Sequence, residues 1–478
     1  MSGGNVSGEI AEAAPGAPAP ADPPALSSGD RRRRARRTGS AIAKIYLGYK
    51  GLELLDHGVL RRPVRAARRR WHRESARTLY EAALDMGGLL LKVGQYLSAR
   101  ADLLPAAYHE QLERLQDRVP PHPYTVVRRV IEEELGAPPD QVFRHFWRRP
   151  IASASLAQVH RAVLHDGRHV AVKVRRPEVV AVVEADLANL RTALNAIERI
   201  EGDSGLGPVL DEIGQAVPHE LDFSREAENQ RRSAKAFEND ASVRVPAVIG
   251  SLSTSRVLVT EYVSGTKVTD LRRLRRLGLD PGEIASALVE AYAAQILHHG
   301  FFHADPHPGN LIVVATGDGF ALAFVDFGLA QEVPARFRER IGVLAAALVG
   351  GAPYDVAGAL RDLGLDAADD TLNAVSDLLV EAVQSARSGL DEREVAERRR
   401  QIGHALARRI REDGDARVPP YLWGMARVLG LVSGVAATLG TRLDLIGGIL
   451  PFLAPPPAPG PTPPRESTRP PESEDAEA

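Results

Sequence analysis

The segment "FFHADPHPGN", residues 301–310, brings together side chains that could bind a metal ion or move a proton. Within eight positions it holds two imidazoles, one carboxylate and one amide: His303, Asp305, His307 and Asn310. The carboxylate and the amide carry oxygen donors of the kind that Mg²⁺ prefers. The two imidazoles could instead begin a zinc site, although the chain has no Cys and shows no convincing third ligand. A purely structural loop is the remaining interpretation.

Three further charged residues offer the other groups that phosphoryl transfer requires. This chemistry needs a cation near the phosphates, a carboxylate that fixes the cation, oxygen ligands for Mg²⁺ and a group that positions the attacking atom. Lys173 ends the strand-like "VAVK", Glu226 lies in the helical "ELDFSREAEN", and Asp326 follows the apolar "ALAFV" and opens "DFG". By itself, "VAVK" would also suit any half-buried strand that ends in solvent.

The elements that must position these residues follow a recognisable order. Residues 155–177 alternate around Asp166-Gly167, which predicts two antiparallel strands joined by a tight turn. A helical stretch follows at 180–239, and the apolar strand at 255–265 then leads into a connector. The rest, up to residue 450, is mainly helical apart from the short strands "NLIVV" and "ALAFVDFG".

This order resembles the bilobal protein-kinase fold, so we predict an α+β, kinase-like fold with an N-terminal helical extension and a helix-rich C-lobe. The five-residue interval from Asp305 to Asn310 equals that of the kinase catalytic loop, where Asp positions or deprotonates the nucleophile and Asn binds Mg²⁺. "VAVK" and "DFG" match the kinase lysine and metal-ligand motifs. The predicted catalytic residues are Asp305, Lys173 and Glu226, and the predicted Mg²⁺ ligands are Asn310 and Asp326.

One segment departs from the kinase pattern. A glycine-rich loop is replaced by "PIASASLAQVH" at 150–160, and Ala and Ser largely forbid the positive φ that lets glycine backbone approach phosphate. We therefore expect this loop to hold ATP differently. The predicted nucleotide contacts are Ala152, Ser153, Ala154 and Ser155 of the loop, Lys173, and Glu261 and Val263 at the start of the connector.

Taken together, the motifs resemble the UbiB family of atypical kinase-like proteins. They are "KVGQ" at 92–95, "ASAS" at 152–155, "VAVK", "ELD" at 220–222, "HADPHPGN" and "DFG". The resemblance implies an ATP-binding, Mg²⁺-dependent ATPase or small-molecule kinase that supports the biosynthesis of isoprenoid quinones or related lipids at a membrane surface. The alternatives are a nucleotide-gated lipid-binding or scaffold protein without turnover and, less favoured, a protein kinase.

The same resemblance implies a regulatory lid made by Lys92 and Gln95 together with Glu220 and Asp222. Lys92 and Gln95 are three residues apart and so share one helix face. In the family these elements pack over the cleft where a protein kinase would bind its peptide. An ordinary surface helix with a solvated lysine is the alternative.

Composition excludes several classes of protein. The net charge is −2, from 60 basic and 62 acidic residues, which argues against a protein that coats nucleic acid. The lack of Cys excludes disulfides, thiolate nucleophiles and Cys-ligated metals. The family resemblance implies ATP, a lipid or phenolic quinone precursor and proteins of a lipid-biosynthesis pathway as partners, and an anionic membrane surface is a further expected partner.

Local composition suggests five segments. Both ends are too poor in large apolar residues to fold, the first being rich in Ala, Pro and Gly and the last in Pro and acidic residues. We predict a disordered tail with an Arg run at 1–40, a helical extension carrying "KVGQ" at 41–140, a kinase-like N-lobe with an inserted helical unit at 141–265, a C-lobe at 266–450, and a disordered tail at 451–478.

Hydropathy argues against a helix that spans a membrane. The longest uncharged runs, Ile341–Tyr354 and Val428–Thr441, have 14 residues each, short of the about 18–20 that a spanning helix needs. Charged residues also interrupt the first apolar stretch, so no signal peptide is predicted and a cytoplasmic, peripheral location is expected.

The N-terminal region offers a surface for such peripheral binding. Apolar residues recur at helical spacing between "RRRRARR" and the Arg-rich 61–73: Ile42, Ile45, Tyr46, Tyr49 and Leu52. Anionic lipid would attract such a surface. A solvated basic face packed on its own domain is an equal alternative.

Overall fold

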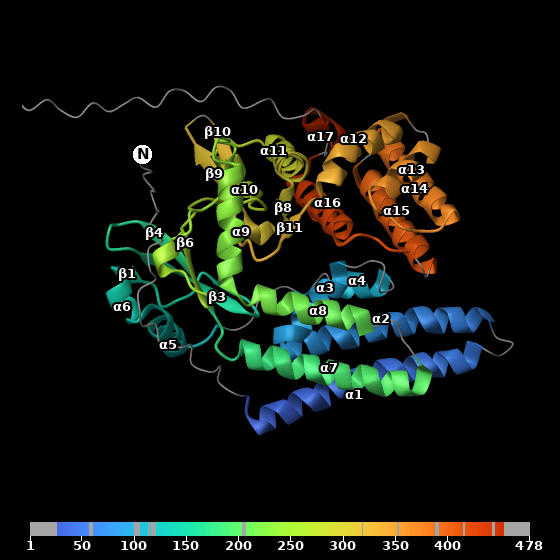
Figure 1. Ribbon diagram of the computed structural model, residues 1–478, viewed down its shortest axis with the longest axis horizontal. Coiled ribbons are helices and arrows are strands. Elements are labelled where there is room, and N and C mark those ends of the chain that lie inside the picture. Colours follow the sequence, from blue (N-terminus) through green and yellow to red (C-terminus); the bar gives the residue numbers. More distant parts are fainter. Residues whose placement is uncertain are drawn as a thin grey trace, which may run out of the picture.

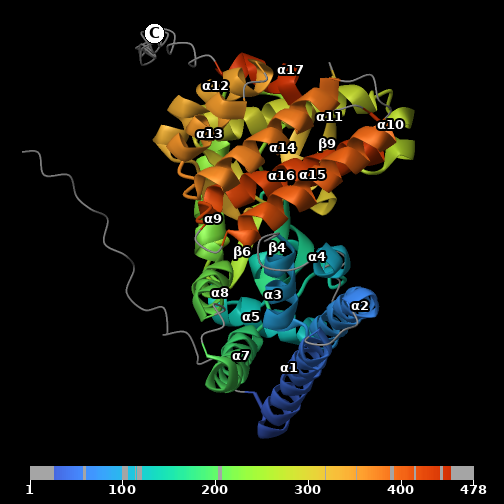
Figure 2. The same cartoon turned by 90° about the vertical axis from the view of Figure 1, so that its right-hand side faces the viewer.

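Two stacked lobes and a layer of long helices make up the protein (Figure 1, Figure 2). The computed structural model describes residues 26–56, 61–99, 106–112, 115, 121–202, 207–317, 319–350, 353–387, 392–413, 416–441 and 445–453. The helical layer and the smaller lobe lie side by side, and the helix-rich lobe lies above both in Figure 1. The predicted α+β, kinase-like bilobal fold is confirmed.

The N-lobe is built on an antiparallel sheet with the order β1-β3-β4-β6, to which β2 adds by pairing with β3. Its strands are β1 (His145–Phe146), β2 (Ala152–Ser153), β3 (Ala157–Val163), β4 (His169–Arg175) and β6 (Val257–Glu261). The β3–β4 hairpin was predicted. Gly167 has a φ of +90° in its turn, a conformation that glycine adopts at little cost.

Two helices, α5 (Tyr124–Leu135) and α6 (Pro139–Val142), also belong to the N-lobe. Val130 and Ile131 of α5 share one buried core with Val172 of β4 and Val259 of β6. The predicted boundary at residue 140 was therefore wrong, because the apolar face of α5 is buried against the sheet and not in the helical extension.

The helical layer contains both N-terminal helices and helices inserted after β4. It comprises α1 (Ser28–Asp56), α2 (Arg61–Met86), α3 (Gly88–Ala99), α4 (Ala106–Leu112), α7 (Val179–Glu201) and α8 (Gly207–Glu220). The prediction of disorder up to residue 40 was wrong for 28–40. Helix α1 begins there because the Ser27 hydroxyl accepts a hydrogen bond from the Asp30 amide at 3.1 Å and caps the first turn.

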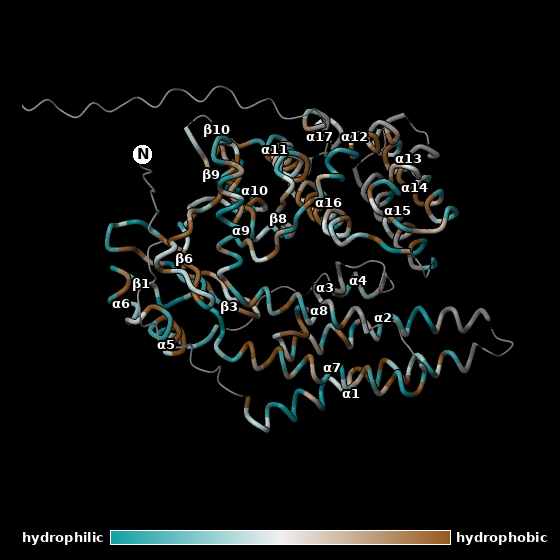
Figure 3. Tube along the Cα trace, viewed as in Figure 1, coloured by the Kyte–Doolittle hydropathy of each residue, from teal (hydrophilic) through white to brown (hydrophobic). Residues whose placement is uncertain are grey.

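The apolar stripe of α1 packs mainly within the protein. Helix α1 lies against α2 and α7, with Ile42 and Ile45 half-buried and Leu52 buried. Leu47 and Tyr49 are exposed instead. The structure thus favours intramolecular packing for most of the stripe. Tyr49 lies against Trp71 of α2, which directly follows the exposed Arg68, Arg69 and Arg70. Figure 3 shows the mixed hydropathy of α1 and α2.

Helix α9 (Phe223–Ala236) connects the two lobes. Phe223, at its first turn, belongs to a small core cluster with Leu258 of the N-lobe strand β6. Phe237, directly after its last turn, belongs to the C-lobe core. Asp222 starts the helix by accepting a hydrogen bond from the Ser224 amide at 3.0 Å.

The C-lobe combines short strands with most of its helices around one large core. The strands are β5 (Val243–Arg244), β7 (Thr266–Lys267), β8 (Phe301–His303), β9 (Leu311–Thr316), β10 (Gly319–Phe324) and β11 (Ala330–Glu332). They form the sheets β5-β10-β9-β7 and β11-β8. The helices are α10 (Leu271–Arg276), α11 (Pro281–Ala293), α12 (Ala335–Gly350), α13 (Pro353–Asp362), α14 (Asp369–Arg387), α15 (Glu392–Glu412), α16 (Pro420–Leu439) and α17 (Leu445–Ile449).

Of the helices in the described residues, α16 alone is long and apolar enough to cross a membrane by length and composition. The qualifying stretch is Tyr421–Leu439, of which 39% is buried inside the protein. The uncharged run begins only at Val428, whereas the apolar helix extends back through Arg427 to Tyr421.

Candidate active site

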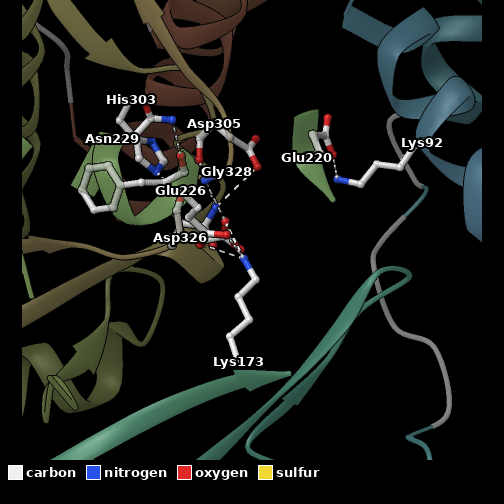
Figure 4. A network of polar contacts seen from close by, with 11 residues as sticks. Lys92, Lys173, Glu220, Glu226, Asn229, His303, Asp305, Asp326 and Gly328 are labelled. Carbon is white, nitrogen blue, oxygen red and sulfur yellow. Dashed lines mark hydrogen bonds and ion pairs between the residues drawn. The ribbon is translucent and has the colours of Figure 1, made fainter. Parts of the chain in front are cut away.

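Lys173 lies at the centre of the predicted site, between two carboxylates from different parts of the chain (Figure 4). Its Nζ donates to both carboxylate oxygens of Glu226 at 2.8 Å. The same Nζ lies 3.1 Å from Oδ1 of Asp326. The structure therefore brings together three of the five residues that were predicted as catalytic or metal-binding groups.

Local structure explains why these side chains meet. Lys173 stands between Val172 and Val174, whose buried side chains point into the N-lobe core, so the lysine leaves the opposite face of β4. Glu226 is in the first turn of α9, whose start Asp222 fixes. Asp326 lies two residues after the end of β10. Between them, the Val325 amide donates to the Asn310 carbonyl at 3.0 Å, which joins "DFG" to the loop 305–310.

Burial and mutual contact shift the pKa values of all three charged groups. Burial raises the pKa of Glu226 to about 7, with Lys173 opposing the shift and Asp326 adding to it. Burial alone would lower the pKa of Lys173, but Asp326 and Glu226 together raise it above its ordinary range. The pKa of Asp326 is lowered, because Lys173 outweighs the effect of burial. Lysine is thus held charged.

Asp326 adopts a backbone conformation that orients its side chain. Its φ is +66°, and no other described residue except glycines has a positive φ. Such a conformation is costly for a side chain with a Cβ and needs support from its surroundings. His303 Nε2 donates to the Asp326 carbonyl at 2.8 Å, and the Gly328 amide donates to Asp326 Oδ1 at 3.3 Å. A Cβ on Gly328 would lie 3.2 Å from that same oxygen.

The two histidines of the opening motif have separate structural tasks. His303 is buried, and its amide donates to Gln295 Oε1 at 2.8 Å. His307 Nδ1 accepts from the Gly309 amide at 3.1 Å and so starts the short 3-10 turn Pro308–Asn310. In the described part of the chain, no group of three or more His, Cys, Asp and Glu residues could hold a metal ion. The zinc interpretation therefore gains no support.

Asp305 is held from two sides. The Asn310 Nδ2 donates to the Asp305 carbonyl at 3.2 Å and to its Oδ2 at 3.4 Å. Arg427 of α16 donates through Nη2 to Oδ1 at 2.8 Å, and both side chains are 27% exposed. Sequence analysis missed Arg427. The available signal was a single charged residue inside the apolar stretch Tyr421–Leu439.

The donor set near "DFG" fits Mg²⁺. The ion takes oxygen ligands and usually combines one or two carboxylates with waters and substrate phosphates. The Asp326 side chain is 48% exposed, and Asn310 is half-buried beside it in the joined loops. When its Nδ2 donates to Asp305, the Asn310 amide keeps its oxygen as an acceptor.

The alanine-rich loop is braced by an arginine that the sequence analysis did not identify. Arg176 Nε donates to the Ala154 carbonyl at 3.0 Å, and its Nη2 donates to Ser153 Oγ at 3.1 Å. Ser155 and Arg176 are buried, whereas Ala152 is exposed. Instead of using glycine flexibility, the loop is shaped by a guanidinium beneath it.

The connector residues behave differently from each other. The Glu261 amide donates to the Ala247 carbonyl at 2.8 Å, and its carboxylate pairs with Arg244. Its amide and carboxylate are thus occupied by protein groups, which disfavours a side-chain contact to nucleotide. Val263 is buried, beyond the end of β6.

Of the four residues predicted to form a lid, the structure brings Lys92 and Glu220 together. Lys92 Nζ lies 3.0 Å from Glu220 Oε2, and each side chain is 17% exposed (Figure 4). Lys92 also lowers the pKa of Asp326, although its effect is smaller than those of burial, which raises this pKa, and of Lys173, which lowers it. Asp222 instead caps α9. The side chain of Gln95 lies outside the described residues.

Two small details fix the elements around the lid. A Cβ on Gly94 would lie 2.4 Å from Leu115 Cδ1, so the glycine of "KVGQ" lets α3 approach its neighbours closely. Asn229, one turn after Glu226 on α9, donates through Nδ2 to the Phe327 carbonyl at 3.1 Å. After Arg427 and Arg176, Asn229 is the third site residue that the sequence did not single out.

The sequence is similar to those of several known proteins. Residues 114–356 match the model of the ABC1 atypical kinase-like domain. The Arabidopsis thaliana protein "ACTIVITY OF BC1 COMPLEX KINASE 7, chloroplastic" is 41% identical over 271 residues, which are 56% of this chain and 39% of that protein. The Synechocystis protein sll0095 is 32% identical over 440 residues, covering 91% of this chain and 75% of that protein.

Two further similarities concern a named kinase and a solved structure. "AarF domain-containing protein kinase 1" of Xenopus laevis is 37% identical over 269 residues, 56% of this chain and 52% of that protein. The structure of the Rv3197–erythromycin complex from Mycobacterium tuberculosis aligns with a TM-score of 0.56 and 25% identity, covering 78% of this chain and 94% of that one. The match covers less than half of the length of each of the first four curated relatives.

Proposed function

Because the chain belongs to the ABC1 atypical kinase-like family, which includes the UbiB and AarF proteins, we propose that it binds ATP with Mg²⁺ and turns it over as an ATPase or small-molecule kinase. The observation that carries this proposal is the contact of Lys173 with Glu226 and Asp326, 2.8 and 3.1 Å away. An ion pair with a purely structural role would need only one carboxylate. The second carboxylate here belongs to Asp326, a strained and half-exposed residue beside the loop that carries Asp305 and Asn310.

The roles follow from the chemistry of each group. Lys173 would bind the α- and β-phosphates, with Glu226 holding its ammonium in place. Asp326 and Asn310 would hold Mg²⁺, and Asp305 would orient the attacking hydroxyl or water. When bound, ATP supplies the transferable phosphoryl group, and Mg²⁺ supplies positive charge that compensates the negative charge of the phosphates. The Arg176-braced loop at 152–155 would then contact the phosphates from the N-lobe.

We further propose that the acceptor is water or a lipid or phenolic precursor in the biosynthesis of an isoprenoid quinone or related lipid. The support is the motif resemblance, together with the exposed Leu47 and Tyr49 of α1. Tyr49 contacts Trp71 of α2, which directly follows the exposed arginines at 68–70. Such a surface would bind anionic lipid and place the cleft near a membrane-embedded substrate.

The lid supports small acceptors over protein substrates. The Lys92–Glu220 contact joins α3 to α8 beside the cleft, where a protein kinase would receive a peptide. A nucleotide-gated scaffold would use the same contacts without turnover, so turnover itself distinguishes the two functions.

The first test is a thermal shift with Mg²⁺–ATP. We expect Asp326→Asn to abolish the Mg²⁺-dependent part of the shift while the variant remains folded. Asp362→Asn is the matched control, since Asp362 is a comparably exposed C-lobe carboxylate that pairs with Arg340. An undiminished shift in Asp326→Asn would contradict the metal assignment.

The second test is ADP release by the full chain. It is measured with and without vesicles of anionic phospholipid, and with and without a simple phenol as precursor analogue. Release that requires Asp305 and rises with these additions supports the proposed function. Binding of Mg²⁺–ATP with no release under any condition would favour the scaffold.

A further inference from the structure

The helix that carries "KVGQ" starts at a sharp corner in the chain. Gly87 separates α2 from α3 and Gly88 is the first residue of α3, and their φ values are +54° and +56°. A Cβ on Gly88 would lie 2.5 Å from Val182 Cγ1 of α7, so the corner is pressed directly against that helix. The direction of α3, and with it the position of Lys92, therefore depends on how this corner is held.

An ion pair lies on the corner. Arg34 of α1 donates through Nε to Asp186 Oδ1 at 2.8 Å and through Nη2 to Oδ2 at 2.5 Å. Its Nη1 donates to the Met86 carbonyl at 2.9 Å, at the last residue of α2. The Cβ position of Gly88 is 3.5 Å from Arg34 Nη2 and 3.8 Å from Asp186 Oδ2. One guanidinium thus joins α1, α7 and the end of α2.

This pair differs from its neighbours on α1. The Asp186 side chain is fully buried and that of Arg34 is 14% exposed. Arg33 and Arg37 meet Asp85 at 3.9 and 3.3 Å, with more than half of each arginine exposed. Exposed pairs contribute little, whereas a buried bidentate pair fixes one geometry, because breaking it leaves an uncompensated charge.

We propose that Arg34 and Asp186 are positioning residues for the lid: by clamping the Gly87-Gly88 corner, they place α3 so that Lys92 reaches Glu220 beside the cleft. This inference rests on the proposed function, since the lid acts on nucleotide turnover. According to this proposal, α1 helps to position Lys92, although α1 lies on the far side of the helical layer from the candidate active site.

The test compares three altered proteins with the wild type as full chains. Arg34→Met/Asp186→Leu removes both charges, so that no buried charge is left unpaired. Arg34→Lys keeps the charge but loses the fork that serves the carboxylate and the Met86 carbonyl together. Arg77→Gln is the control, because Arg77 forms an exposed surface pair with Glu81 on the neighbouring helix α2.

The first readout is amide hydrogen exchange in residues 86–94, measured without nucleotide. We expect exchange there to become at least ten-fold faster in the double variant and intermediate in Arg34→Lys. It should stay unchanged in Arg77→Gln and in the core strands of every variant. Unchanged exchange at the corner in a folded double variant would overturn the proposal.

The second readout is the effect on kcat and on KM for ATP. The double variant should reproduce the kcat and KM changes of Lys92→Ala, and combining it with Lys92→Ala should add nothing, because both act through α3. A purely structural role would lower the active fraction and add to the effect of Lys92→Ala, which would overturn the proposal. If the wild type releases no ADP, the proposed function fails, and the exchange measurement alone decides whether the pair holds the corner.

Discussion

Replacing Arg427 by Gln should slow ATP turnover by roughly ten-fold while leaving ATP affinity nearly unchanged. Arg427 Nη2 lies 2.8 Å from Asp305 Oδ1, so the arginine fixes the carboxylate that we assign to orient the attacking atom. Without it, the Asp305 carboxylate keeps only the 3.4 Å hydrogen bond from Asn310 Nδ2 among its described hydrogen bonds and ion pairs, and should sample unproductive rotamers.

The magnitude follows from distance and exposure. Two unit charges 4 Å apart interact by about 4 kcal/mol at an effective dielectric constant of about 20. Both side chains are 27% exposed, so water and salt reduce the usable part. A net effect of about 1–2 kcal/mol on the transition state corresponds to roughly five- to thirty-fold in kcat.

The assay is steady-state ADP release across a range of ATP concentrations. Arg427→Lys should recover part of the rate, since it keeps the charge but donates from a single nitrogen. Arg340→Gln, which removes a more exposed C-lobe arginine paired with Asp362, is the control. An unchanged kcat in folded Arg427→Gln, or a loss that Arg340→Gln shares, would refute the reasoning.

Three further outcomes are expected. Lys92→Ala should change the kcat or KM of ADP release several-fold, whereas Lys235→Ala, which removes an exposed lysine at the end of α9, should not; equal kinetics would make Lys92 an ordinary surface residue. Because burial raises the pKa of Glu226 to about 7, the native state binds more protons than the unfolded state between about pH 4.5 and 7. The melting temperature of the wild type should therefore fall with rising pH in that window relative to Glu226→Gln; parallel curves would contradict this. Cosedimentation with anionic vesicles should weaken with added salt and on replacing Leu47 and Tyr49 by Ser, and binding that resists both changes would place the membrane surface elsewhere.

The predictable parts of the site are those that short segments determine. Asp305 and Asn310 are joined by one turn, and the Lys173 strand belongs to a hairpin whose turn residues are adjacent in sequence. Local propensity and spacing therefore suffice to place them. Glu226 was predictable because the motif order assigned it to the helix that faces that strand.

The remaining parts depend on long-range packing. Arg427 is 122 positions from Asp305, and Arg34 is 152 positions from Asp186. In each case an ordinary charged residue gains its role only when the fold removes it from water. The same reason explains the misplacement of α5, since an amphipathic helix does not show which neighbour will cover its apolar face.

Helix α9 has a mechanical consequence for how nucleotide enters and leaves. Its 14 residues span about 21 Å, from the N-lobe cluster at Phe223 to the C-lobe core at Phe237. Along that length it contacts Lys173 of one lobe and the Phe327 carbonyl of the other. A helix fixed at both ends acts as a rigid spacer, so the lobes cannot swing apart about their connector without losing several of these contacts together. We therefore expect nucleotide exchange to proceed by local displacement at the edge of the cleft, with the distance between the lobes nearly constant.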